Sequence, residues 1–230
     1  MGKKTARGKS FFEQLNNVKT IAICTNGDQK ALNAGVALSL FIKERYNKTP
    51  FVVYAGDLDS VDTIYSEYAE IRETLSNKKL KIIIDYKNTD IDSLQWEKTD
   101  DHKLIMELKP INRSFDPNKI KYETSGEDVD MIIMVGIPDP RKLGDFYEKN
   151  KKDIEESYLV NIDTHIANKQ YGQINIVYPE SESIISLILR KFADWKYTPN
   201  AVISTILLYG LHKTAEVEKP ALQIEVDASQ

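Results

Sequence analysis

Short apolar runs that alternate with amphipathic segments constrain the fold of this chain more than any other feature. The runs of strand length, rich in β-branched residues, are 20–24, 51–54, 80–86, 130–135, 158–162 and 174–177. Segments with the period of a helix lie between and after them, at about 30–45, 61–75, 141–157, 182–195 and 199–214. Strands that alternate with helices predict βαβ units. We therefore expect an α/β fold in which helices flank a mostly parallel sheet.

The alternation is interrupted after the third run. Two short segments, around 94–96 and 104–108, flank a polar turn at 98–102. This pattern is typical of an antiparallel β-hairpin. We interpret residues 87–129 as an insertion that contains the hairpin and ends in a polar connection over 110–129.

The remaining sequence fits one domain. A chain of 230 residues has the length of a single α/β domain with a small insertion, here residues 18–214, followed by a tail at 215–230. A hydrophobic content of 41% suffices for one core, and no apolar run approaches the roughly 20 residues of a membrane helix. Cys24 is the single cysteine, which excludes an internal disulfide. A reducing, cytoplasmic location is the simplest interpretation.

Residues 1–17 are expected to form a basic N-terminal arm. Its basic residues lie among small neighbours without an apolar period, and they are Lys3, Lys4, Arg7 and Lys9. A solvated terminus accounts for this pattern, and so does an arm that contacts nucleic acid or an acidic partner. The net charge of -4 argues against a broad nucleic-acid-binding face.

Three loops are the expected place for chemistry. In open parallel sheets, ligands bind at the carboxyl ends of the strands. In this sequence those ends are residues 24–30, 136–139 and 163–165.

The first loop carries a family resemblance. Residues 24–31 read CTNGDQKA, which resembles the first motif of the DHH phosphoesterases, H-x-N-x-D-x-D-A. Cys24 stands in place of the family's histidine, and Lys30 in place of its second aspartate. The residues that match are Asn26, Asp28 and Ala31.

The second loop and the last helix resemble two further motifs of the family. In residues 130–143, Gly136 stands in place of the metal-bridging aspartate, whereas Asp139 is retained. The last helix contains a Gly-Leu pair that resembles the final motif, and either Lys213 or Thr214 takes the place of its aspartate.

The third loop resembles the motif that names the family. It reads Asp163-Thr164-His165, with Thr164 in place of the first histidine. The residues that match farther along are Asn168, Tyr171 and Gly172. The resemblance covers roughly residues 19–214. This segment is similar to the RecJ-like and oligoribonuclease-like domains of the family. The insertion resembles that of short bacterial members, and we expect the usual C-terminal substrate-binding domain to be absent.

The resemblance implies a pair of Mn²⁺ or Mg²⁺ ions that activates water. Such hard cations need several carboxylate and imidazole ligands. Lys30 would place an ammonium group where a cation should lie, Gly136 removes a ligand, and Thr164 is a poor substitute for imidazole. The ligands that remain are Asp28, Asp163 and His165. On this basis we expect no metal and no other cofactor.

A hypothesis follows for the space that the metals would leave. Lys30, and with it Lys213, would occupy that space and pair with Asp28, Asp139 or Asp163. Buried carboxylates would then be satisfied without ions.

The same residues also have structural interpretations. Cys24 is expected to be a small buried hydrophobe rather than a nucleophile. Asp28 either caps the next helix or binds a ligand, and Asp139 is expected to cap the helix that follows it. His165 is interpreted as a structural hydrogen bonder, and Asp163 as a polar anchor at the end of its strand.

Three functional interpretations result. In the first, the chain is a pseudoenzyme, a non-catalytic DHH-like domain that acts as a binding or scaffold module for a nucleotide, a nucleic-acid end or a protein, with no membrane partner. In the second, it is a metal-dependent phosphodiesterase or phosphoesterase whose atypical site uses Mn²⁺ or Mg²⁺. In the third, a surface such as the hairpin edge recruits a protein partner or a second copy. The substitutions favour the first and the third. The candidate pocket residues are Cys24, Asn26, Asp28, Lys30, Gly136, Asp139, Asp163, Thr164 and His165.

Overall fold

The computed structural model describes residues 10–75, 79–87, 89–112, 114–126 and 128–217. The chain divides into two compact units, one formed by residues up to 76 and from 128, the other by residues 77–127. We call them the α/β unit and the inserted unit. The predicted fold class, an α/β fold with a parallel sheet flanked by helices and an antiparallel hairpin insertion, is confirmed.

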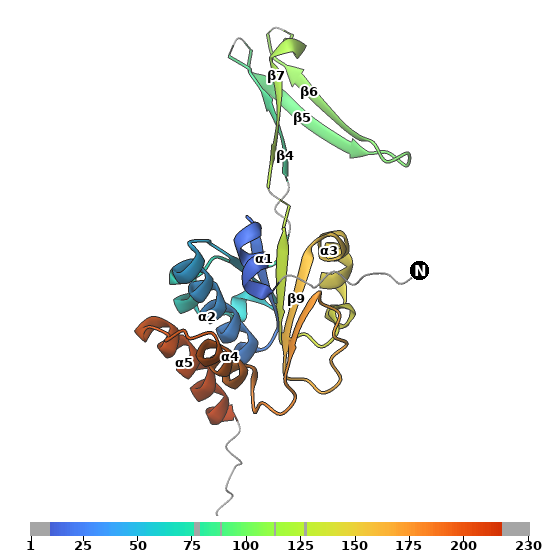
Figure 1. The fold of residues 1–230 in the computed structure, drawn as a ribbon. Helices are drawn as coiled ribbons and strands as arrows, with labels where there is room; N and C mark the ends of the chain where they lie inside the picture. Colours follow the sequence, from blue (N-terminus) through green and yellow to red (C-terminus); the bar gives the residue numbers. More distant parts are fainter. Residues whose placement is uncertain (1–9, 76–78, 88, 113, 127, 218–230) are drawn as a thin grey trace, which may run out of the picture. The chain divides into compact units, whose positions relative to one another are not determined.

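A parallel sheet of six strands forms the centre of the α/β unit (Figure 1). Its strand order is β10-β9-β8-β1-β2-β3, and each pair of neighbours is parallel. The strands are β1 (Ile21–Asn26), β2 (Phe51–Ala55), β3 (Ile71–Arg72), β8 (Met131–Val135), β9 (Tyr158–Asp163) and β10 (Ile174–Val177). Parallel strands need crossover connections, which the helix at 29–46 supplies between β1 and β2 and the helix at 145–156 between β8 and β9.

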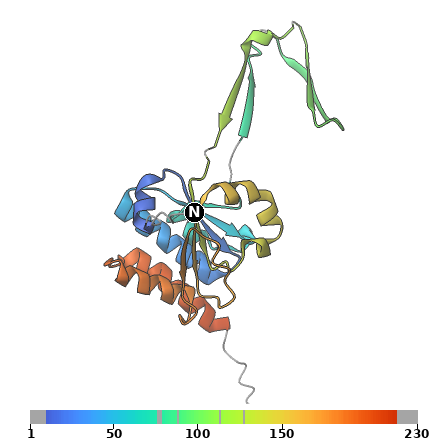
Figure 2. The same ribbon diagram turned by 45° about the vertical axis from the view of Figure 1, so that its right-hand side comes forward.

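Helices cover both faces of this sheet (Figures 1 and 2). On one face, α1, α2, α4 and α5 share a core with the sheet, and on the other α3 does so. The helices are α1 (Phe11–Asn17), α2 (Gln29–Tyr46), α3 (Asp145–Glu156), α4 (Ile184–Asp194) and α5 (Ala201–Val217). The short 3₁₀ helices of this unit are η1 (Leu58–Ser60), η2 (Thr63–Glu67) and η4 (Pro140–Leu143).

The alternation of side chains in β1 shows how the strand serves both cores. Ile21 and Ile23 point into the core under α2, whereas Ala22 and Cys24 point into the core under α3. All four are at most 2% exposed. Successive side chains of a strand point to opposite faces, so a central strand of a covered sheet is apolar throughout.

The expected N-terminal arm does not extend to residue 17. Residues 11–17 form α1, and Phe11 and Leu15 are buried in the core. Ser10 begins the helix with a capping box, in which its side chain accepts from the backbone of Glu13 and the Glu13 side chain accepts from the backbone of Ser10. The basic part of the arm, residues 1–9, lies outside the described residues.

The helix predicted over residues 61–75 is wrong. Here η2 follows the capping residue Asp62, and the chain then extends into β3, where Ile71 pairs with Val52 of β2. The apolar period of this segment fits a helix, but the open edge of the sheet recruits its second half as a strand. Pairing at the edge satisfies backbone groups that a strand would otherwise leave open.

The inserted unit consists of two antiparallel pairs of strands. The predicted hairpin is confirmed as β5 (Ile91–Lys98) and β6 (Leu104–Pro110). The run at 80–86 was expected in the parallel sheet, but it forms β4 (Lys79–Ile84) and pairs with β7 (Ile120–Ser125). The polar connection expected before residue 129 therefore contains a strand, and η3 (Pro117–Lys119) precedes it.

The sequence analysis found no apolar run long enough for a membrane helix, and the helices of the structure can be checked in the same way. Within the described ranges, no helix is both long and apolar enough to cross a bilayer.

Candidate functional site

The carboxyl ends of β1, β8 and β9 lie side by side, as predicted. Thr25 pairs with Val135, and Val135 pairs with Ile162. The next residues along the three strands are Asn26, Gly136 and Asp163, so the three candidate loops leave the sheet at one edge. The register of the central strands thus brings together residues that are far apart in the sequence.

Asn26 joins the first loop to the second. Its Nδ2 donates to the carbonyl oxygen of Gly136 at 2.8 Å, and its Oδ1 accepts from the backbone of Asp28 at 3.2 Å. An asparagine side chain with both ends engaged in this way positions two loops.

Asp28 serves as the N-cap of α2. Its Oδ2 accepts from the backbone of Ala31 at 3.1 Å, and its backbone is extended, as an N-cap requires. One of the two roles expected for this residue is therefore observed. The carboxylate lies at the exposed rim of the loop rather than in a closed pocket.

Lys30 does not make the predicted ion pair. It is partly exposed, and the ion pairs between described residues do not include it. Each carboxylate proposed as its partner binds backbone or side-chain donors of its own loop instead. The side chain of Lys213, the second lysine of that hypothesis, lies outside the described residues, as does that of Thr214.

Gly136 occupies a backbone conformation that favours glycine. Its φ is +69°, and a Cβ placed there would lie 3.2 Å from the Cβ of Ala31. Its N–H donates to the carbonyl oxygen of Ile162 at 3.0 Å, which continues the pairing with β9. An aspartate at this position would therefore have to adopt left-handed backbone against the first turn of α2.

Asp139 caps η4, as predicted, and binds one arginine. Its Oδ1 accepts from the backbone and the Nε of Arg141, and its Oδ2 accepts from a guanidinium nitrogen of Arg141 at 2.9 Å. The Arg141 guanidinium beside Asp139 holds the pKa of that carboxyl below its usual range. Both carboxylate oxygens are thereby engaged in a bidentate pair.

Asp163 is a buried polar anchor, as predicted. It is 3% exposed, its Oδ1 accepts from the backbone of Thr164 at 2.8 Å, and its Oδ2 accepts from Asn168 Nδ2 at 2.6 Å. Both carboxylate oxygens of this buried side chain are therefore hydrogen-bonded. Asn168, which the sequence analysis named as a match to the third motif, is thus the side chain that holds Asp163.

Two asparagines that the sequence analysis missed complete this network. Asn161 of β9 is fully buried and donates to Asn168 Oδ1 at 2.7 Å and to Asn175 Oδ1 at 3.1 Å. Asn175 of β10 in turn donates to the carbonyl oxygen of Gly172 at 2.7 Å. Both interrupt apolar strand runs, and a polar residue inside such a run was the available signal, because buried amides require partners.

The third loop is also fixed to the second. Lys169 donates through its backbone to the carbonyl oxygen of Pro138 at 2.9 Å, and the Tyr171 hydroxyl donates to that of Ile137 at 2.8 Å. His165 lies in this loop with an exposed side chain, and its Nδ1 accepts from the backbone of Ala167 at 3.2 Å. The structural role expected for His165 is the role observed.

Cys24 and Tyr171 are both in their neutral forms at ordinary pH. Burial raises the pKa of the Cys24 thiol, and it is a fully buried side chain under α3. Burial, followed by the nearby Asp163, Cys24 and Asp139, raises the pKa of Tyr171. A neutral buried thiol is a poor nucleophile and a poor metal ligand, so Cys24 behaves as the small hydrophobe that was predicted.

A cavity of about 230 Å³ lies beside this network, between α3 and the loop that follows β9. Apolar side chains contribute to its lining, and the charges of Asp139 and Glu155 balance those of Arg141 and Lys169. The charges therefore do not select an anionic ligand. The residues that line it are Asp139, Pro140, Arg141, Tyr147, Ile154, Glu155, Ser157, Leu159, Lys169, Tyr171 and Gln173.

The described side chains do not fit a paired-metal centre. Among them, no three histidine, cysteine, aspartate or glutamate side chains are grouped so that they could hold a metal ion. Asp28, Asp163 and His165, the ligands that the sequence left in place, are thus not brought together as one donor set. Each makes a hydrogen bond within its own loop.

Comparisons with known proteins give a likeness among solved structures. No protein-family model matches the chain, and no curated protein matches it. Among solved structures, it is similar to an exopolyphosphatase-related protein from Bacteroides fragilis, with a TM-score of 0.47 and 12% sequence identity. The match covers 89% of this chain and 55% of that protein, so the chain spans about half the length of the protein it matches.

Proposed function

We propose that this chain is a non-catalytic DHH-like domain that acts as a binding or scaffold module. The observation that carries the proposal is the engagement of the three candidate carboxylates by protein donors. Asp28 caps a helix, Asp139 holds Arg141, and Asp163 is held by Asn168. These groups stabilise the loops of the α/β unit, where an enzyme of the DHH type would use them to hold metal ions.

The changes at the other motif positions support the same proposal. Lys30 adds a positive charge at a position where the DHH motif has an aspartate, and Gly136 occupies left-handed backbone that disfavours the aspartate of the second motif. Two divalent cations need a net negative cage. Because the charged residues that line the cavity beside the loops balance one another, this unit is better suited to binding another molecule than to hydrolysing a phosphate ester.

Titration with Mn²⁺ by calorimetry, with a parallel assay for hydrolysis of a short oligonucleotide and a cyclic dinucleotide, tests the proposal. We expect no binding up to millimolar metal and no turnover. Asp28→Ala and Asp28→Asn serve as matched variants, because only the second keeps the helix cap. Micromolar binding that both variants abolish, together with turnover, would contradict the proposal and support an atypical phosphoesterase that uses Asp28, Asp163 and His165.

A further inference from the structure

The hairpin of the inserted unit has one apolar face. Directly paired residues point to the same side of a two-stranded sheet. Three consecutive pairs on one side are Leu94 with Leu108, Trp96 with Met106, and Lys98 with Leu104. Lys98 contributes an aliphatic stem, so this side of the hairpin is a continuous apolar stripe.

The opposite face of the hairpin is polar. Its pairs are Gln95 with Glu107, Glu97 with Ile105, and Ser93 with Lys109. A sheet that alternates in this way has one face built to cover a core and one face built for solvent.

The apolar face is nevertheless exposed. The exposed fractions are 65% for Trp96, 59% for Leu94, 58% for Leu104 and 41% for Met106. Most of the exposed large hydrophobic side chains in the described chain belong to the inserted unit. Apolar patches of this kind on a folded protein mark interaction sites, and an isolated two-stranded hairpin is marginally stable unless its face packs against something.

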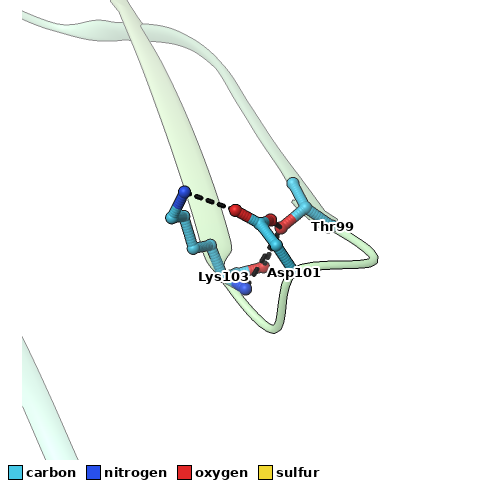
Figure 3. A network of polar contacts seen from close by, with 3 residues as sticks. All are labelled: Thr99, Asp101 and Lys103. Carbon is cyan, nitrogen blue, oxygen red and sulfur yellow. Dashed lines mark hydrogen bonds and ion pairs between the residues drawn. The ribbon is translucent and has the colours of Figure 1, made fainter.

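The hairpin has a defined tip, which fixes the register of the stripe. At the turn, Thr99 donates through its backbone to the carbonyl oxygen of Lys103 at 2.9 Å, and Asp101 binds the hydroxyl of Thr99 and the ammonium of Lys103 (Figure 3). His102 takes the left-handed conformation that closes the turn. The stripe is therefore an ordered surface.

We propose that this stripe is the contact surface of a homodimer, in which the hairpin of a second copy packs on it face to face. The stripe is self-complementary about its middle. A twofold axis at the Trp96–Met106 pair lays the indole of each copy against the centre of the other stripe, with leucines on both sides. Closed twofold pairing is the commonest symmetry of soluble oligomers, and sulfur–aromatic contacts favour such a centre.

The area fits a second copy. With about 150–250 Å² for a whole aromatic side chain, and with leucine and methionine near the lower end of that range, the four exposed residues present roughly 400 Å² per copy. With Leu108 and the stem of Lys98, two copies would bury about 1,000 Å², the size at which a specific interface begins.

The charge of the hairpin disfavours a polyanionic partner. Over residues 91–110 the acidic residues outnumber the basic ones, and the charged residues are Asp92, Glu97, Lys98, Asp100, Asp101, Lys103, Glu107 and Lys109. Nucleic acid binds through clustered basic residues, which this hairpin lacks. The inference is independent of the proposed function of the α/β unit.

The test is the mass of the full-length chain in solution, measured by light scattering and by sedimentation equilibrium. We expect twice the 26.3 kDa of one chain. Met106→Lys and Ile105→Lys form a matched pair, because the two residues are adjacent in β6, have exposed fractions of 41% and 39%, and point to opposite faces. Met106→Lys should raise the dissociation constant at least ten-fold, and Ile105→Lys should leave it unchanged.

Trp96 fluorescence supplies a second measurement in a Trp195→Phe background. Its emission should shift to shorter wavelength as the protein concentration rises, and this shift should disappear in Met106→Lys. A monomeric mass at every concentration would overturn the proposal, whether Trp96 emission is that of an exposed indole or that of an indole covered by another part of the chain. An equal loss of dimer in both lysine variants would overturn it as well.

Discussion

At the scale of single residues, the conformation of Gly136 disfavours a carboxylate at that position of the second loop. A φ of +69° costs an L-residue with a Cβ roughly 1–2 kcal/mol, and the added Cβ would also meet Ala31 at 3.2 Å. The backbone of this loop and the identity of its residue are thus matched. A ligand side chain here would require another backbone path.

We predict that Gly136→Ala lowers the free energy of unfolding by about 1–2 kcal/mol. Urea denaturation monitored by circular dichroism measures the change. Measured against Ala31→Gly alone, Gly136→Ala should cost less, because the contact is absent and only the cost of the left-handed backbone remains. An unchanged denaturation midpoint in Gly136→Ala would show that the loop adopts ordinary backbone.

The Asp139–Arg141 pair predicts a pH dependence. The pKa of Asp139 is lowered from its ordinary value of 3.8, so the charged carboxyl stabilises the fold above that value, and the contribution is lost as the pH falls through the lower pKa of the folded state. Wild type should exceed Asp139→Asn in free energy of unfolding at neutral pH by a small margin, since Arg141 is largely exposed. Urea denaturation should show the two proteins converging in strong acid, whereas a difference independent of pH would contradict the role of the charge.

At the scale of elements, the sequence predicts the central strands of the sheet. It does not predict segments such as β3, whose conformation depends on pairing with a neighbouring strand. The central strands are apolar runs with β-branched residues, and the structure places them in one parallel sheet. Ile71 carries the same apolar signal in a helix as in an edge strand, so only the neighbouring β2 settles its conformation. The helix at 11–17 has a local sequence signal, the Ser10–Glu13 capping box. The basic composition of residues 1–9 favoured a solvated arm over this signal.

The N-cap of α2 gives a prediction that separates capping from metal binding. Asp28→Ala should destabilise the protein by about 1 kcal/mol, because the backbone of Ala31 loses its acceptor. Asp28→Asn should retain most of the stability, since asparagine caps helices as well as aspartate does. Thermal denaturation with and without Mn²⁺ measures both, and stabilisation of wild type alone by Mn²⁺ would show that Asp28 is a ligand.

At the scale of the whole molecule, sequence reasoning predicted that the three loops lie at one edge of the sheet, but it did not give the contacts within them. The rule that parallel strands present their carboxyl ends at one edge was sufficient to place Asn26, Gly136 and Asp163 together. The partners of the carboxylates depend on loop conformations, and these follow from buried amides such as Asn161. Lys30 shows that charge complementarity alone does not predict an ion pair. It was expected to pair with a carboxylate, but in the first turn of α2 it makes no such pair with a described residue.

The α/β unit and the inserted unit carry different features of the chain. The α/β unit brings three polar loops together at the ends of its central strands, and their polar groups bind protein donors. The inserted unit carries the exposed apolar surface through which the chain would meet a partner. Under the proposed function, both units are available to bind other molecules, the α/β unit through its loops and the inserted unit through its apolar stripe.

A crystal of the protein soaked in excess Mn²⁺ tests the central claim most directly, because the anomalous signal of manganese locates bound ions. We predict no manganese peak at the ends of β1, β8 and β9, with Asp28, Asp139 and Asp163 still bound to their protein donors. A peak coordinated by Asp28, Asp163 or His165, with these hydrogen bonds broken, would contradict the account and identify the loops as a metal site.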